Sequence, residues 1–178
     1  MNQDIGPLVV ELFLEGAQAI GVCRQVQERR RFIDILNTQD SVVELQEAAV
    51  WVAGAQEPKN FSTLAIIKHT IIAAVPRETK EQDRMRAVLT NVMGKQNTEQ
   101  QTVSLIVPPL TIEGAAHMPT GAGVTVNLTE RLSRFFPVTN ATLSIPNLAD
   151  RQMDVILVSR EHVVGTSVAP VSRYASAV

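Results

Sequence analysis

The hydrophobic pattern of the first half of the chain predicts β-strands. Residues 7–14 place apolar side chains at every second position, which is the period of a strand. The same alternation returns over residues 41–52. Residues 62–75 are rich in β-branched side chains and are interrupted at 68–70, which predicts two strands joined by a tight turn.

Two kinds of break interrupt this strand pattern. Gly16 and Gly21 permit a tight bend or a bulge, because glycine adopts conformations closed to other residues. Residues 29–36 contain three apolar side chains at i, i+3 and i+4, which is the spacing of one helical turn. We expect this turn to cap one end of a small sheet.

One longer amphipathic helix is predicted at residues 80–93. Thr79 and Gln82 have the spacing of a capping box at its start, and Gly94 stands where a helix commonly ends. Its apolar residues recur with helical period and are expected to pack on a sheet. They are Met85, Val88, Leu89, Val92 and Met93.

The second half repeats the strand pattern. Residues 102–112 read as a strand, but the Pro108–Pro109 pair predicts either an edge strand or a break, since proline donates no ladder hydrogen bond. Residues 133–136 read as a second helical cap. Residues 142–145 and 153–167 read as the later strands.

The two halves match block by block, which indicates an internal duplication. Residues 12–17 match 110–115, and residues 64–72 match 156–164, with further matched positions between these blocks. The conserved order of the blocks and their apolar spacing support the match more strongly than the identities do.

These patterns predict a mainly β (α+β) protein. It contains two repeated small sheets or barrels with short helical caps, packed as a pseudo-two-fold pair and joined by one amphipathic helix. The predicted parts are a first β repeat (1–76), a linker with the helix (77–101), a second β repeat (102–168) and a mobile tail (169–178).

Composition narrows the class of protein without identifying it. The 178 residues carry a net charge of −2, which gives no long-range attraction to nucleic acid or anionic membranes. Glu11, Lys68 and Asp154 interrupt the most apolar segments, so no membrane span is predicted. The single cysteine excludes an internal disulfide, and the first residues lack the order of a signal peptide, so we expect a cytoplasmic bacterial protein.

Five arginines are the candidate partner-binding residues. Arg29, Arg30 and Arg31 form a run, and Arg131 and Arg134 stand at the matching place in the second half. Guanidinium groups bind phosphates and carboxylates well, which favours a binding role. The alternative is a solvated turn with local ion pairs, in which a recurring arginine bonds nearby carbonyl groups.

No pattern in the chain indicates catalysis. His69, His117 and His162 lie in separate blocks and lack the spacing of a metal site. Cys23 has no base beside it in the sequence to lower its pKa. We therefore expect no enzyme activity and predict no catalytic, cofactor-binding or metal-binding residues.

The chain resembles an uncharacterised bacterial family of small β domains. The resemblance rests on residues 31–37, 43–45 and 64–72, where the family has an Arg-Leu-Ser-Asp-Phe-Leu-Asn-like turn between short strands. Residues 131–137 look like the same motif, with Arg134 and Pro137 departing from it. A looser similarity to Sm-like barrels implies a small-barrel fold, but their second-motif Arg-Gly element is absent here.

The leading functional hypothesis is a non-enzymatic interaction or assembly module whose partner is a protein, either another copy or a different chain. Duplicated scaffolding without converging reactive residues suits that role. RNA or DNA binding through the arginine-bearing turns is the first alternative, and the low aromatic content disfavours it. Small-ligand binding or enzyme activity in a cleft between the repeats is the second.

Overall fold

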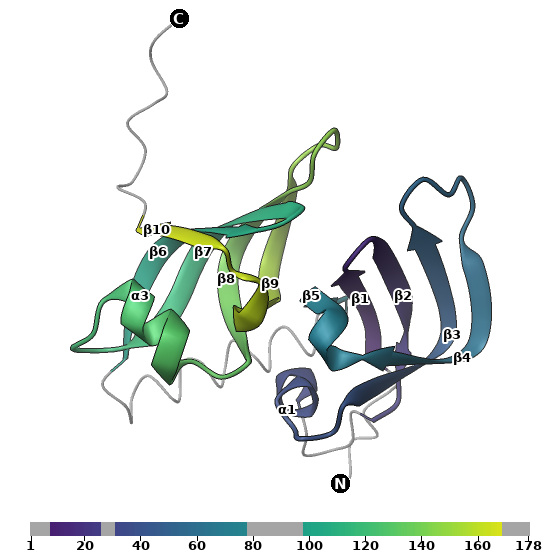
Figure 1. The fold of residues 1–178 in the computed structure, drawn as a ribbon, viewed down its shortest axis with the longest axis horizontal. Helices are drawn as coiled ribbons and strands as arrows, with labels where there is room; N and C mark the ends of the chain where they lie inside the picture. The colour runs from purple at the N-terminus through teal and green to yellow at the C-terminus, as the bar shows by residue number, and fades with distance from the viewer. Residues whose placement is uncertain (1–7, 26–30, 78–97, 169–178) are drawn as a thin grey trace, which may run out of the picture.

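The computed structural model describes residues 8–25, 31–77 and 98–168 of the chain. Ten strands form one antiparallel sheet in the order β10-β6-β7-β8-β9-β5-β1-β2-β3-β4 (Figure 1). The strands are β1 (Leu8–Leu14), β2 (Ala17–Cys23), β3 (Val42–Val52), β4 (Lys59–Ile67), β5 (Ile71–Pro76), β6 (Thr98–Val107), β7 (Leu110–Pro119), β8 (Phe135–Ser144), β9 (Arg151–Ser159) and β10 (Gly165–Val168).

The prediction of a mainly β protein is confirmed. The strands belong to one hydrogen-bonded sheet rather than to two separate sheets, because β5 of the first half pairs with β9 of the second. The amphipathic helix predicted at 80–93 and the tail predicted at 169–178 lie outside the described residues. The strands predicted at 7–14 and 41–52 are confirmed as β1 and β3.

Each half of the sheet has the same pairing order. The first half runs β5-β1-β2-β3-β4, and the second runs β10-β6-β7-β8-β9. In the first half, the three residues of the 3-10 turn η1 (Lys68–Thr70) join the two border strands. In the second half, five residues (160–164) join them, and the first three form the 3-10 turn η3 (Arg160–His162). Such a turn rises about 6 Å, whereas five flat strands would separate the borders by about 19 Å. Each half must therefore curl, so that its two border strands lie closer together than they would in a flat sheet.

A bulge lies at the same place in each half. The register shifts at Gly21 between β2 and β3, and at Gly114 between β7 and β8. On the facing strands, Glu47 and Asn140 have positive φ angles of 50° and 48°. A bulge increases the local twist and bends the strand, which favours the curl of each half.

The two halves differ in their helical segments. The helical turn predicted at 29–36 is confirmed as α1 (Phe32–Leu36). In the second half the helical residues are α3 (Val124–Val126) and the π-helical turn η2 (Asn127–Arg131). The helical cap predicted at 133–136 is wrong, because Phe135 and Phe136 already belong to β8 and enter different apolar clusters.

The Pro108–Pro109 pair forms the turn between β6 and β7. Val107 and Leu110 are the last paired residues on either side of it. The segment predicted as one strand at 102–112 therefore contains parts of two strands, and the predicted break is a hairpin turn. Proline suits this place because a turn residue donates no ladder hydrogen bond.

Two clusters of buried apolar side chains form the core, and each takes side chains from both halves. The first-half cluster includes Val155 and Leu157 of β9. The second-half cluster includes Phe13 of β1 and Ile72 of β5. The junction between β5 and β9 is therefore part of the core.

Replacing Gly114 with alanine is expected to destabilise the fold by about 1–3 kcal/mol, because a side chain would overpack the bulge. An added Cβ would lie 2.9 Å from the carbonyl oxygen of Thr139. The measurement is the free energy of unfolding in urea. Gly123→Ala is the matched control, since a Cβ there meets nothing within 4 Å and the φ angle is −66°; equal losses for the two variants would contradict this account.

Candidate assembly interface at the sheet edges

The central junction is the contact between β5 and β9. Ala73 lies opposite Val158, and Ala74 lies opposite Leu157, in an antiparallel ladder. Only these two pairs form the ladder, so side chains around it must supply much of the attachment between the halves.

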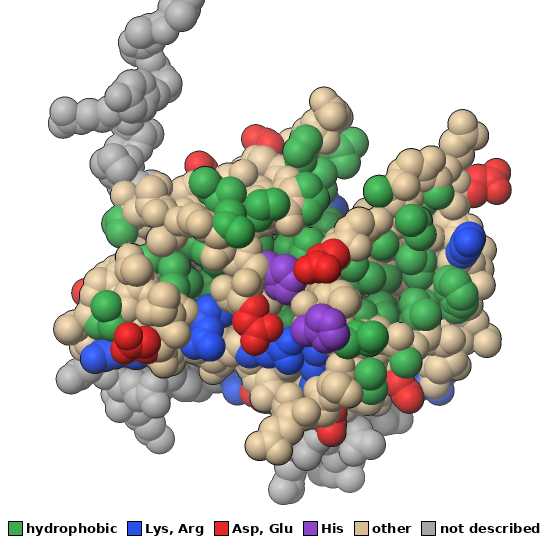
Figure 2. Space-filling view, viewed as in Figure 1, with side chains coloured by type: hydrophobic (Ala, Val, Ile, Leu, Met, Phe, Trp, Pro, Cys, Tyr) green, Lys and Arg blue, Asp and Glu red, His purple; other side chains and the backbone are tan. Residues whose placement is uncertain are grey.

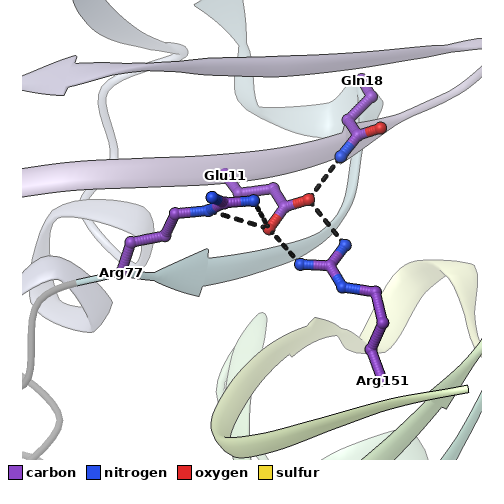
Figure 3. A network of polar contacts seen from close by, with 4 residues as sticks. All are labelled: Glu11, Gln18, Arg77 and Arg151. Atoms are coloured by element: carbon purple, nitrogen blue, oxygen red, sulfur yellow. Dashed lines mark hydrogen bonds and ion pairs between the residues drawn. The ribbon is translucent and has the colours of Figure 1, made fainter.

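A buried carboxylate ties the halves together beside this ladder. Glu11 of β1 has no exposed surface. Arg151, at the start of β9, donates to both carboxylate oxygens at 2.8 and 2.7 Å, and Arg77, which follows β5, donates at 3.0 and 3.2 Å (Figure 3). The Gln18 amide also donates to Glu11. Since Arg151 alone comes from the second half, its bonds to Glu11 cross the junction.

The arginines keep this carboxylate ionised. Burial by itself raises the pKa of Glu11, because removal from water disfavours the charged form. The hydrogen bonds and positive charges of Arg151 and Arg77 outweigh burial, so the pKa of Glu11 lies below its ordinary value of 4.5. The same contact with Glu11 raises the pKa of Arg151.

Two further polar links cross the junction. The Asn37 side chain, at the end of α1, donates to the backbone carbonyl of Phe135 at 2.9 Å and accepts from its N–H at 2.8 Å. His162 of η3 places Nε2 3.2 Å from the Glu15 carboxylate. These links fix the orientation of the two halves at points away from the ladder.

The outer borders of the sheet are β4 and β10, which lie in different halves (Figure 1). Among the described residues, β4 pairs only with β3 and β10 pairs only with β6. The segment from β4 through η1 (59–70) has the same element lengths as the segment from β9 through η3 (151–162), at an offset of 92 residues. β5 follows η1 directly, and β10 follows η3 after two residues. The sheet therefore presents at its borders the same two kinds of strand that pair at the central junction.

Side chains that are buried at the central junction have exposed counterparts at the outer borders. Ile72 is 2% exposed, whereas Val164, at the corresponding position, is 71% exposed. Phe13, beside β5, is 5% exposed, whereas Ile106, beside β10, is 50% exposed. The outer borders thus leave open the apolar positions that the central junction covers.

Most of the exposed large apolar side chains gather at these borders. Of the eight in the described part of the chain, five lie in β4, in β10 or directly beside β10. Exposed strand edges with apolar side chains are typical sites for pairing with another chain. The five are Phe61, Ile67, Ile106, Val164 and Val168.

An apolar groove is lined by residues of both halves, and hydrophobic side chains line this hollow in Figure 2. Its volume is about 290 Å³. The lining includes Trp51 and Val52 from the first half and Ile145 and Leu148 from the second. None of its lining residues is ionisable, so the groove offers binding surface and no acid–base group.

The arginine run of the first half is only partly described. Arg29 and Arg30 lie outside the described residues. Arg31 is the N-cap residue of α1, and its guanidinium donates to both carboxylate oxygens of Asp34, at 2.9 and 2.7 Å. This geometry matches the alternative of a local ion pair, while a partner-binding role for Arg31 stays a prediction.

The two arginines of the second half have different surroundings. Arg131 is the last residue of η2 and is exposed. Arg134 lies 3.1 Å from the Glu161 carboxylate, with its guanidinium 6.0 Å from the centre of the Phe135 ring. Arg31 and Arg134 therefore belong to separate ion pairs, each within its own half.

Sequence reasoning missed the junction network. Its one local signal is Glu11, a charged residue within the apolar alternation of β1. Its partners Arg77 and Arg151 lie 66 and 140 positions away along the chain. No local pattern can link residues at such separations.

Within the described ranges, no three His, Cys, Asp or Glu side chains are grouped so as to hold a metal ion. Over the same ranges, no helix is both long enough and apolar enough to cross a membrane.

Comparison with known proteins finds no match for this chain among protein-family models, curated proteins or solved structures.

Replacing Glu11 with glutamine is expected to lower the free energy of unfolding near neutral pH by about 3 kcal/mol, since removing one partner of a buried ion pair leaves the other uncompensated. This expected loss lies at the low end of the range for breaking a buried ion pair, because the side chains of Arg77 and Arg151 are partly exposed. Urea denaturation measures it.

The pH dependence provides a second test of Glu11. A lowered folded-state pKa stabilises the protein fully above the ordinary pKa of 4.5, and this stability is lost as the pH falls below that value. Glu11→Gln should flatten the stability curve in this acidic range. Glu161→Gln, which breaks an exposed pair with Arg134, is the control and should cost less than about 1 kcal/mol; a loss as large as that of Glu11→Gln would contradict the account.

Proposed function

We propose that this chain is an internally duplicated, non-enzymatic assembly module that binds protein through its open sheet edges. The observation that carries this proposal is the central junction, where border strands of the two halves pair while strands of the same kinds stay open at the outside. The duplication is supported by the shared pairing order and by the matching bulges at Gly21 and Gly114. We also propose that the chain is related to the bacterial small β domains that it resembles, and that it is located in the cytoplasm.

Strand addition is the binding mode that these edges suit. An open edge offers backbone donors and acceptors to a partner strand, and side-chain pockets beside it give specificity. Ile67 in β4 and Val164 before β10 are exposed apolar residues at the two edges. Soluble proteins commonly protect open edges with charges, so the apolar residues retained here favour a role in binding.

Nucleic-acid binding has weaker support. Arg31 and Arg134 are both held by carboxylates, which neutralise the charge that a phosphate backbone would need. The net charge of −2 adds no attraction. The exposed Arg131 is the described residue that best supports this alternative.

The groove between the halves favours a second candidate function, the binding of a small apolar ligand. Its size and apolar lining suit a compact hydrophobic molecule. If this candidate is correct, Val52→Asp should abolish the fluorescence increase of an apolar dye such as 1-anilinonaphthalene-8-sulfonate, whereas Val126→Asp, outside the groove, should not. An equal signal from the two variants would exclude the groove as the binding site.

With another copy as the protein partner, the assembly function predicts that the wild-type protein forms a species larger than one chain. Light scattering coupled to size-exclusion chromatography measures the mass across a dilution series. Ile67→Lys should reduce the mass, because it places a charge on the outer edge of β4, at the position that corresponds to the buried Ser159 of β9.

Leu148→Lys is the matched control for this experiment. Leu148 is also an exposed apolar residue, but it lies in the turn between β8 and β9, away from both sheet edges. Its mass distribution should equal that of the wild type. The assembly function would be refuted by a wild-type protein that stays a single chain at every concentration and that also recovers no partner protein in a pull-down from its native host.

A further inference from the structure

We propose that the partner at the outer edges is a second copy of this chain, with β10 of one copy pairing with β4 of the next as β5 pairs with β9 within the chain. This inference rests on the proposed assembly function and specifies its partner and geometry. The offset of 92 residues places β10 where β5 lies and β4 where β9 lies, so the outer edges are complementary to each other in the same way as the two strands of the junction.

The central ladder fixes the register expected between copies. Shifted by the same offset, its two residue pairs place Gly165 opposite Ile66 and Thr166 opposite Ala65 of the neighbouring copy. The strands run antiparallel, as they do at the central junction.

The apolar side chains of the β10 edge are positioned to enter the neighbouring copy. At the central junction, Ile72 and Phe13 pack into the cluster of the second half. Their exposed counterparts, Val164 and Ile106, are placed to pack in the same way against the first-half cluster of the next copy. Burial of such side chains stabilises by about 25 cal/mol for each Å² of apolar surface removed from water.

The β4 edge carries smaller side chains than its counterpart. Val155 and Leu157 of β9 cross the central junction into the first-half cluster. The corresponding residues of β4 are Thr63 and Ala65, which are exposed. The contact between copies therefore buries less apolar surface than the central junction and is weaker.

The buried carboxylate has no counterpart between copies. The position that corresponds to Glu11 is Ser104, and the position that corresponds to Arg151 is Lys59. The Ser104 hydroxyl lies 3.5 Å from the exposed Glu113 carboxylate, so Lys59 of the neighbour is placed to pair with Glu113. An exposed pair contributes only about 0–1 kcal/mol, which makes this contact readily reversible.

Pairing of two different edges makes the assembly head-to-tail. Each copy that joins leaves one open β4 edge and one open β10 edge, so the sheet continues until a ring closes or a filament grows. A symmetric contact would pair β4 with β4 or β10 with β10, and the central junction provides no example of either pairing.

Mixing two singly blocked variants tests this geometry. Ala65→Lys places a charge on the β4 edge, and Val164→Lys places one on the β10 edge; both positions are exposed, so both variants should fold. Each variant alone should elute as one chain. The equimolar mixture should form a two-chain complex, because the intact β10 of the first variant pairs with the intact β4 of the second. Light scattering would record this as a doubling of mass.

The outcomes separate this inference from the assembly function. If the wild type assembles but the mixture has the mass of the separate variants, head-to-tail pairing is overturned while the assembly function stands. A wild type that is always a single chain overturns the pairing between copies, and the assembly function falls with it if a pull-down from the native host also recovers no partner protein. Circular dichroism of each variant confirms that the sheet is intact.

Disulfide trapping tests the register by a second route. A Thr166→Cys copy mixed with an Ala65→Cys copy should form a crosslinked dimer under mild oxidation, because directly opposed strand positions approach within disulfide distance. Thr166→Cys mixed with Thr63→Cys is the control, displaced by two residues along β4, and should crosslink far less. The native Cys23 is buried and should not compete. Equal crosslinking of the two mixtures would overturn the register.

Discussion

The pairing of β5 with β9 is the contact on which the arrangement of the molecule depends. Backbone N–H and C=O groups at the edge of a buried strand must find partners, and each half leaves one such strand without a neighbour of its own. Pairing β5 with β9 resolves this for both strands and merges the halves into one sheet. The same contact lets Leu157 and Ile72 complete the apolar cluster of the opposite half.

The buried Glu11 makes this junction specific. A carboxylate withdrawn from water is tolerated only when hydrogen bonds and opposite charges satisfy it, and here Arg151, Arg77 and Gln18 do so. Because those donors converge from both halves, one relative orientation of the halves satisfies the carboxylate. The outer edges lack such a carboxylate, because Ser104 and Lys59 occupy the positions that correspond to Glu11 and Arg151.

One of the two interpretations of Arg31 and Arg131 was that a recurring cation bonds carbonyl groups at a helical segment. Such cations are present in both halves, but they are other residues. Lys68 in η1 donates to the carbonyl of Ile35, and Arg160 in η3 donates to that of Leu132.

The sequence match between residues 12–17 and 110–115 pairs β1 with β7, and these two strands hold different places in the pairing order of their halves. Alternating strands resemble one another at many offsets, so apolar pattern alone did not fix the correspondence.

Local patterns in the sequence determined the mainly β class, most strand positions, the turn at residues 68–70 and the helical turn after Arg31. These features depend on neighbouring residues, so alternation and turn chemistry are enough to predict them. Only the tertiary structure decided that the halves share one sheet, that Glu11 meets Arg151, and that Phe135 lies in a strand. Those outcomes depend on contacts between distant segments and on burial, and a one-dimensional pattern carries neither.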